Sequence, residues 1–366
     1  MPDRIYLDHA ATSPLRPEAR RAMEEGFALW ANPSSPHAEG RKARAALEDA
    51  RERIKEALGW DGELIFTSGA SEAALLVFDS ADVLNEVVSA VEHDCIHGFA
   101  RDRGLVEIPA DASGALDVEA LDRLSVEPSH HARRHIENRR LVAIQDVNSE
   151  TGNRQDIENY AECVHQNGSL IVVDCVQSAG KFSLSRNIDF ALISAHKFGG
   201  PIGIGALLVK DYAMLKPSGG QERGYRRGTE NLPGALGMAA ALEDAGDPYV
   251  AFEILEPFDA LADECRKLGG TWLSDGLSDP TPYIRAIAMP NMSATAQVMR
   301  FDMAGIAVSQ GSACSSGTMK TSRVLEAMQV EPEIAANTIR VSVGWNTTRA
   351  EVERFCEVWL DLAKPR

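Results

Sequence analysis

Two segments of the 366-residue chain carry side chains whose types and positions could serve catalysis. The first holds a lysine, Lys197, which follows the apolar run DFALISA and precedes two glycines and a proline. An ammonium at the end of a buried strand is poorly solvated, so its pKa should fall and the amine can act as a nucleophile or a base. On position alone, a lysine that extends to the surface fits equally well.

The second segment, IVVDCVQSAGK, places Asp174 near the end of an otherwise apolar run. A buried carboxylate is costly unless it is paired, and a pyridinium nitrogen would be such a partner. An aspartate that pairs with a pyridinium and a lysine that forms a Schiff base are the two protein groups that pyridoxal-phosphate chemistry requires. Taken by itself, Asp174 fits better as an aspartate that caps a turn.

Two further segments carry weaker signals. FTSGASEAAL is typical of a strand that turns through Ser68 and Gly69 into a helix beginning near Ala70, and such a helix start can bind an anion. SQGSACSSGTMKTS holds Cys314 among serines and glycines. Most lone cysteines are inert core residues. This segment has almost no apolar anchors, which predicts a mobile, exposed loop with a reactive thiol.

The apolar pattern predicts the elements that must position these groups. Two helices are expected over 17–30 and 37–58. Short apolar runs typical of buried strands follow at 63–69, 85–91, 141–147, 169–176, 189–195 and 205–210. Helical segments between them predict an α/β fold with a mostly parallel sheet covered on both faces. Beyond about residue 245 a smaller region is expected, with strands at 282–289 and 338–344 and a last helix near 349–363.

Charge and cysteine content exclude several classes of function. Lys and Arg total 37 against 54 Asp and Glu, a formal net charge of −17, which disfavours nucleic acid and anionic membranes as partners. The six cysteines include no CxxC pair, which argues against a disulfide framework or a zinc ribbon and favours a cytoplasmic location. No signal peptide and no membrane-spanning run are expected.

Ten segments taken together resemble one family. They are YLDHAAT (6–12), NPSSPH (32–37), FTSGASE (66–72), Glu92-His93, VNSETG (147–152), VDCVQSAGK (173–181), SAHKFGGPIGIGAL (194–207), RGTENL (227–232), GSACSS (311–316) and TIRVSVG (338–344). In this order they resemble the cysteine desulfurases of the NifS and IscS type, which are class V aminotransferase relatives of pyridoxal-phosphate fold type I. The resemblance implies a large cofactor domain over 15–245. A small α/β domain would comprise 1–14 and 246–366 and carry the Cys314 loop.

The resemblance also implies roles for individual residues toward pyridoxal 5'-phosphate. Lys197 would hold the cofactor covalently, Asp174 would pair with its ring nitrogen, and Gln177 would hydrogen-bond its phenolic oxygen. His93 would stack on the ring and shuttle protons. The phosphate would be bound by Ala70, Ser71, Ser194 and His196, with Thr229 reaching it from the other subunit of a homodimer. Ser149 stands where the family usually has a second asparagine, so its contact is shortened or is made by Asn148.

The implied reaction converts L-cysteine to L-alanine. Arg340 would bind the substrate carboxylate, with Asn32 and Asn148 as further substrate-binding residues. Cys314 would take the sulfur as a persulfide, for iron–sulfur cluster or other sulfur-containing cofactor biosynthesis. A sulfur-acceptor protein is therefore an expected partner. The chain ends soon after its last predicted helix, which leaves docking of an iron–sulfur scaffold open.

Three alternatives remain at this stage. One is a selenocysteine lyase or a class V aminotransferase that acts on another substrate. Another is a serine acylase, because Ser194-Ala-His-Lys197 fits the S-x-x-K pattern, although a strand precedes this serine. The third is a zinc site, because His93 and His97 have helical i, i+4 spacing, although the glutamate of HExxH is missing. No metal is expected.

Overall fold

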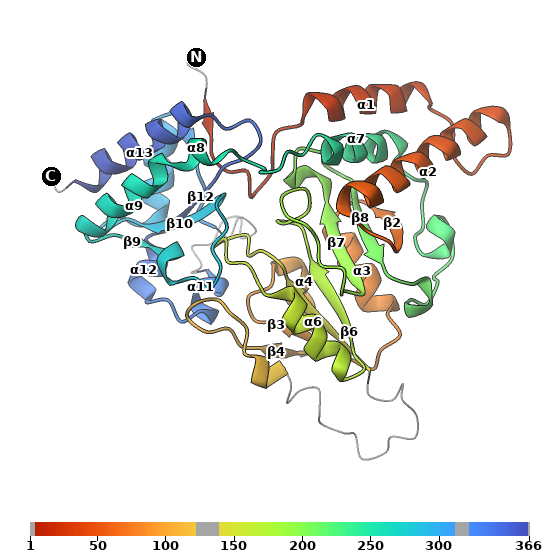
Figure 1. Cartoon of the computed structure of the whole chain (residues 1–366), viewed down its shortest axis with the longest axis horizontal. Helices are drawn as coiled ribbons and strands as arrows, with labels where there is room; N and C mark the ends of the chain where they lie inside the picture. The colour runs from red at the N-terminus through yellow and green to blue at the C-terminus, as the bar shows by residue number, and fades with distance from the viewer. Residues whose placement is uncertain (1–3, 122–138, 312–321, 365–366) are drawn as a thin grey trace.

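The computed structural model describes residues 4–121, 139–311 and 322–364 (Figure 1). Its largest element is a seven-stranded sheet in the order β2-β8-β7-β6-β5-β3-β4. The strands are β2 (Glu63–Thr67), β3 (Asn85–Ser89), β4 (Val106–Ile108), β5 (Arg140–Gln145), β6 (Leu170–Asp174), β7 (Phe190–Ser194) and β8 (Gly205–Val209). Only β8 runs against its neighbours in this sheet. The predicted strands and the mostly parallel sheet are thus confirmed.

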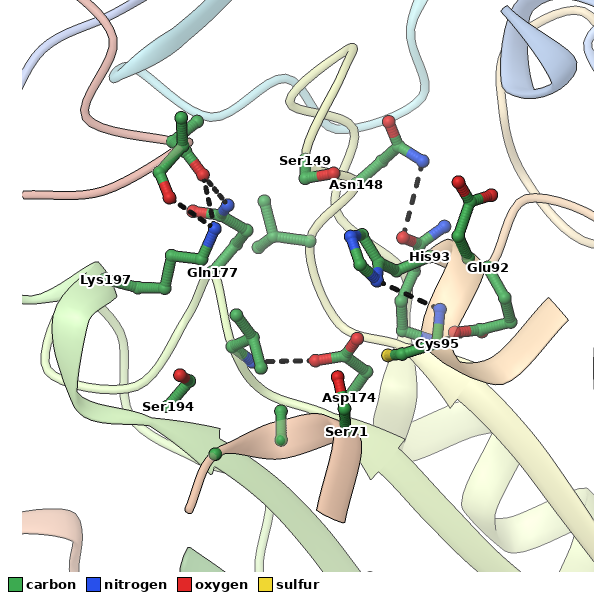
Figure 2. A pocket seen from close by; sticks show the side chains of 18 of the residues that line it. Ser71, Glu92, His93, Cys95, Asn148, Ser149, Asp174, Gln177, Ser194 and Lys197 are labelled. Atoms are coloured by element: carbon green, nitrogen blue, oxygen red, sulfur yellow. Dashed lines mark hydrogen bonds between the residues drawn. The ribbon is translucent and has the colours of Figure 1, made fainter. Parts of the chain in front are cut away.

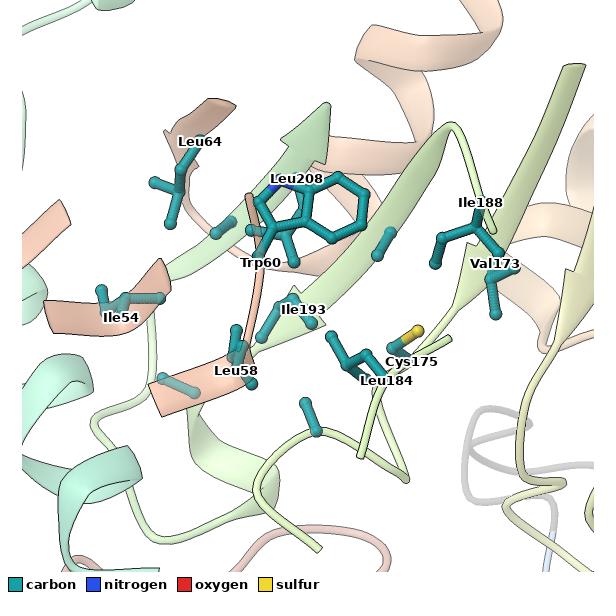
Figure 3. Packing of buried hydrophobic residues seen from close by; sticks show 14 of the residues in the cluster. Ile54, Leu58, Trp60, Leu64, Val173, Cys175, Leu184, Ile188, Ile193 and Leu208 are labelled. Carbon is teal, nitrogen blue, oxygen red and sulfur yellow. The ribbon is translucent and has the colours of Figure 1, made fainter. Parts of the chain in front are cut away.

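Helices cover both faces of this sheet. They are α1 (Pro17–Ala28), α2 (Ala38–Leu58), α3 (Ala70–Ser80), α4 (Asp94–Arg103), α6 (Ile157–Gln166) and α7 (Leu232–Glu243). Alternate strand residues point to opposite faces. Ile171 and Val173 therefore pack with α2, α6 and α7, whereas Val172 packs with α3 and α4. Figure 3 shows part of the first cluster, with Ile54 and Trp60 beside side chains of the sheet.

A second core lies beside the large sheet (Figure 1). It is built on an antiparallel sheet of β9 (Thr271–Trp272), β10 (Ile284–Ala288) and β12 (Thr338–Ser342). Its helices are α8 (Phe252–Leu255), α9 (Pro257–Lys267), α10 (Ala294–Met303) and α13 (Arg349–Ala363). Two short helices, α11 (Arg323–Ala327) and α12 (Pro332–Ala336), pack in a separate small cluster with Ala286 and Ala288 of β10. A short parallel pair, β1 (Ile5–Tyr6) and β11 (Ile306–Ala307), brings the start of the chain to this core.

The N-terminal segment connects the two cores. Leu7 is buried in the second core and donates its backbone N–H to Ala307. A few residues later, the backbone N–H groups of Ser13 and Arg16 donate to the carbonyls of His196 and Gly199, next to the large sheet. We propose the same domain division as the sequence predicts, because the second core combines Leu7 with residues from Tyr249 onward.

A buried ion pair fixes α2 against the large sheet. The guanidinium of Arg51 donates to both carboxylate oxygens of Glu222, at 2.8 and 3.0 Å, and both side chains are almost fully buried. One oxygen of Glu222 also accepts from the backbone N–H of Phe66 in β2, at 2.8 Å. Removing one partner of such a pair leaves a buried charge uncompensated, which costs more than the pair itself contributes.

We therefore expect Glu222→Gln to lower the free energy of unfolding by about 3 kcal/mol, because Arg51 then keeps its buried charge with only the partly exposed Glu48, 3.1 Å from its Nε, as counter-ion. Urea unfolding followed by circular dichroism measures this change. Glu264→Gln is the matched control, since Glu264 pairs with Lys267 on the exposed face of α9. Its effect should stay below about 0.5 kcal/mol, and an equally small effect of Glu222→Gln would contradict the role of the buried pair.

Candidate active site

A cavity of about 510 Å³ opens where the carboxyl ends of β3, β5, β6 and β7 meet. In open α/β sheets this edge is the usual place for a ligand. Most of the site residues predicted from the sequence line this cavity, and several are seen in Figure 2. They are Ala70, Ser71, His93, Asn148, Ser149, Asp174, Gln177, Ser194, His196, Lys197 and Arg340.

Lys197 is presented by a single turn of 3-10 helix (Ala195–Lys197) that follows β7 directly. Its amine donates to the backbone carbonyls of Ala10 and Ala11, at 2.8 and 2.9 Å. Both carbonyls belong to the N-terminal segment that connects the two cores, and dashed lines in Figure 2 mark the hydrogen bonds of the Lys197 amine. The amine is thus held at the cavity wall by acceptors that carry no formal charge.

Asp174 is the last residue of β6 and is buried. Burial raises the pKa of its carboxyl, and the nearby charges of His93 and Lys197 act in the opposite direction. One carboxylate oxygen accepts from the backbone N–H of Val176, at 2.9 Å. A carboxylate in this setting is stabilised by any cation that enters the cavity beside it.

His93 also lines the cavity, where it caps the start of α4. Its Nδ1 accepts from the backbone N–H of Cys95, at 3.2 Å, which assigns the proton of the neutral ring to Nε2. Burial lowers the pKa of the imidazole. At neutral pH the ring is therefore uncharged, as a group that stacks on an aromatic ligand or relays a proton should be.

The start of α3 forms another part of the cavity wall. Gly69 is its N-cap, and Ala70 and Ser71 begin the helix, so the backbone N–H groups of its first turn have no partners within the helix. β8 packs closely here, because a Cβ on Gly205 would lie 2.7 Å from the Cα of Gly69. The hydroxyl-bearing Ser194 also lines the cavity. Such a set of N–H and O–H donors suits an anion.

His196 lines the same cavity as the donors of α3 and Ser194. Burial lowers the pKa of its imidazole to about 4, and the charges of Lys197 and Lys181 add to the effect. Its Nδ1 lies 3.1 Å from the hydroxyl of Thr12. The ring is therefore neutral near pH 7 and supplies hydrogen-bonding atoms rather than a charge.

Arg340, in the middle of β12, is buried and tightly held. Nη2 donates to Asp8 at 2.8 Å, and Nη1 donates to the carbonyls of Ser149 and Gly311, at 2.9 and 3.1 Å. Within the described part of the chain, its buried Nε has no hydrogen-bond partner. The guanidinium is thus fixed in orientation and retains a buried N–H for a further acceptor, such as a carboxylate.

Three predicted residues are not among those that line the cavity. Asn32 and Thr229 are exposed in the single chain, and Asn32 accepts from the backbone N–H of Ser34. Cys314 lies outside the described residues. Its neighbours on either side are informative, because Gly311 lines the cavity and Ser322 donates to Glu150, another lining residue, at 2.6 Å.

The sequence assigned no role to three residues that line this cavity or hold its side chains in place. Arg323 lines it and donates to the backbone carbonyls of Ala90 and Glu92. Glu92 is fully buried, and burial, followed by the charge of Asp174, raises its pKa to about 8. Asp8 holds Arg340. Glu92 follows an apolar run just as Asp174 does, so the same pattern could have singled it out.

Comparison with known proteins matches this chain to the family described as aminotransferase class V, over residues 5–355. The chain belongs to the class V aminotransferase family. A cysteine desulfurase of Cereibacter sphaeroides is 37% identical, with 97% of this chain and 95% of that protein covered. A protein of Bacillus subtilis, named as a putative cysteine desulfurase IscS 1, is 31% identical, with 99% of each covered.

Solved structures agree with this family assignment. A NifS-like protein superposes with a TM-score of 0.85 at 28% identity, covering 98% of this chain and 99% of the other. A NifS-like protein from Rickettsia africae gives 0.86 at 28% identity, with the same coverage. The predicted resemblance and the fold type are thereby confirmed. Within the class V aminotransferase family the chain groups with the cysteine desulfurases, so the predicted enzyme class is confirmed as well.

The alternatives from other classes find little support in the geometry. Ser194 is the last residue of β7 rather than the start of a helix, unlike the serine of S-x-x-K acylases. His97, the second histidine of the zinc alternative, lies 3.2 Å from Glu107. The described residues contain no group of three or more His, Cys, Asp and Glu side chains placed to hold a metal. Nor does any helix in those ranges have the length and apolar character needed to cross a membrane.

The buried Glu92 predicts a specific pH dependence of stability. Its pKa is about 8 in the folded chain and near the ordinary value of 4.5 when unfolded. Its contribution is therefore fully present below pH 4.5 and is lost as the pH rises through about 8. Compared with Glu92→Gln, the wild type should become progressively less stable across this window.

Thermal melting of both proteins at matched pH values measures this difference. The amide oxygen of the variant can still accept from the backbone N–H of Gln145 and the hydroxyl of Ser89, as Glu92 does. The difference between the two proteins therefore reports the ionisation of Glu92 and not the loss of its hydrogen bonds. Melting temperatures that run parallel over the whole window would show that Glu92 does not change its protonation there.

Proposed function

We propose that this chain is a pyridoxal-phosphate-dependent cysteine desulfurase that converts L-cysteine to L-alanine and transfers the sulfur to Cys314. One observation carries the proposal. Lys197 and the buried Asp174 lie on the same cavity, at the carboxyl edge of the sheet, in a chain whose relatives are named cysteine desulfurases. These are the amine and the carboxylate that pyridoxal-phosphate chemistry needs.

The donors and charges around the cavity fit this cofactor. The buried carboxylate of Asp174 has a place beside it for a protonated ring nitrogen, and the start of α3 with Ser71 and Ser194 offers donors to a phosphate. The amine of Lys197 belongs to the wall of the same cavity. When bound, pyridoxal phosphate withdraws electrons from the α-carbon of an amino acid joined to it.

The chain's own residues then bind the substrate and move its protons. Arg340 would bind the carboxylate of cysteine, with Asp8 and the carbonyls of Ser149 and Gly311 holding the guanidinium in place. Nζ of Lys197 would remove the proton from the α-carbon of the substrate. Nε2 of His93 carries the proton of a neutral imidazole and can exchange it within the cavity.

Cys314 would act as the nucleophile toward sulfur. Its thiolate forms a bond to the sulfur of the substrate while the carbon–sulfur bond of the substrate breaks, and the bonding electrons and a proton remain with the product alanine. This proposal is supported by the two ends of the segment that contains Cys314. Gly311 lines the cavity, and Ser322 bonds to Glu150 at its edge.

The finer parts of the proposal concern assembly and partners. Thr229 and Asn32 are exposed and lie off the cavity of their own chain, which is where residues that complete a partner's site in a homodimer must lie. We therefore infer a homodimer in which Thr229 completes the phosphate site of the other subunit. The cytoplasm is the proposed location, because the six cysteines include no CxxC pair. The persulfide on Cys314 would pass to an acceptor protein for the synthesis of iron–sulfur clusters or another sulfur-containing cofactor.

Incubation of the chain with L-cysteine tests this function. We expect equimolar alanine and sulfide in the presence of a reducing thiol, and a persulfide on Cys314 without it. Cys314→Ala should abolish both products and leave the visible absorption of the bound cofactor intact, because this variant removes only the nucleophile. Alanine and sulfur species are measured by mass spectrometry.

Cys163→Ser is the matched control, because Cys163 lies on α6 and is not among the residues that line the cavity. It should keep full desulfurase activity. Unchanged sulfide release by Cys314→Ala would refute the assigned nucleophile. Turnover of selenocysteine with no reaction of cysteine would favour a selenocysteine lyase instead.

A further inference from the structure

A second lysine, Lys181, lies outside the cavity lining and hydrogen-bonds to the lining residue Gln177. The amine of Lys181 donates to Oε1 of Gln177 at 3.2 Å, and Nε2 of Gln177 donates to the carbonyl of Ala10 at 2.8 Å. The same carbonyl accepts from Lys197. Gln177 lines the cavity, whereas Lys181 is not among the lining residues. The two lysines are therefore connected by one amide and one carbonyl.

The turn after β6 brings Lys181 back against Gln177. The backbone N–H of Ala179 donates to Cys175, and that of Lys181 donates to Ser178, at 2.8 and 2.9 Å. Gly180 has a φ of +71°, a conformation that L side chains rarely adopt. The turn thus needs a glycine at this point, and its geometry specifies where the next side chain lies.

The surroundings of Lys181 leave the amine few other partners of opposite charge. It lies 5.4 Å from the centre of the Tyr249 ring, and its backbone carbonyl accepts from the hydroxyl of Tyr283. Burial lowers the pKa of the amine to about 7, and the charge of Lys197 adds to the effect. Both the charged and the neutral amine have N–H groups, so either form can donate to Gln177.

The neighbouring imidazole does not compete for Gln177 as a cation. Burial lowers the pKa of His9 to about 3, and the charge of Lys181 adds to the effect, so its ring is neutral near pH 7. The Nδ1 of His9 lies 3.2 Å from the hydroxyl of Ser13. In this setting Lys181 is the donor placed to bind the oxygen of the Gln177 amide.

A glutamine amide has an acceptor at one end and two donors at the other, and only its partners decide which end faces which way. Lys181 binds the oxygen on one side, and Ala10 accepts from the nitrogen on the other. With the oxygen held by Lys181, the second N–H of Gln177 is free to be offered to the cavity. A cavity that receives an anionic oxygen at this point needs a donor there.

We propose that Lys181 is a positioning residue that holds the amide of Gln177 with its N–H groups toward the cavity. The inference rests on the proposed function and on the role that the family resemblance implies for Gln177, a hydrogen bond to the phenolic oxygen of the cofactor. Without Lys181, the amide can rotate and place its oxygen against that anionic oxygen. Lys181 would then act on the cofactor solely through Gln177.

A double-mutant cycle on the full-length protein tests this inference. Lys181→Met should weaken the affinity for pyridoxal phosphate about tenfold, as expected for the loss of a hydrogen bond to a charged oxygen. It should also shift the visible absorption band of the bound cofactor. In a Gln177→Ala background, Lys181→Met should have no further effect on either quantity. Lys181→Arg, which has only donors, should restore the wild-type values.

Lys210→Met is the matched control, because Lys210 pairs with Asp61 at the surface. It should change neither affinity nor absorption. The proposal is overturned if Lys181→Met leaves the band and the affinity unchanged, or if its effect is equally large without the side chain of Gln177, since that would indicate a structural role alone.

Failure of the proposed function gives a different result. A wild-type chain that binds pyridoxal phosphate and releases no alanine from cysteine would refute the desulfurase, while the cycle still reports on Lys181 and Gln177. A wild-type chain that binds no pyridoxal phosphate at all would overturn both.

Discussion

The burial of the Asp174 carboxyl is the constraint on which the rest of the site depends. A carboxylate at the end of a fully buried strand raises the free energy of the folded chain unless a cation lies beside it. The charges of His93 and Lys197 act on this carboxyl against the effect of burial. A ligand with a protonated ring nitrogen would add a further cation on the same side of the cavity.

The N-terminal segment holds side chains of both cores at the cavity. The carbonyls of Ala10 and Ala11 hold Lys197 of the large sheet, and the carboxylate of Asp8 holds Arg340 of the second core. Three residues within the stretch 8–11 thus set the positions of the amine and the guanidinium relative to each other. Because catalysis depends on such relative placement, the junction between the two cores determines where a substrate must lie.

The sequence predicted the parts of the site that depend on local pattern. Lys197 and Asp174 stand at the ends of apolar runs, and parallel strands bring such ends to one edge of a sheet. The contact between Asp8 and Arg340 joins residues 332 positions apart and has no local signal. The full burial of Glu92 likewise depends on packing around it. The role expected for Thr229 depends on a second subunit and therefore on no pattern within one folded chain.

The central claim is that Lys197 is the residue that carries the cofactor. Borohydride reduction of the protein loaded with pyridoxal phosphate, followed by peptide mass spectrometry, measures this directly. The reduction makes an imine to a lysine permanent, so the modified peptide identifies the residue. The account predicts that the added phosphopyridoxyl mass lies on the peptide containing Lys197 and is absent from that containing Lys181. The label on any other lysine, or no label at all, would contradict it.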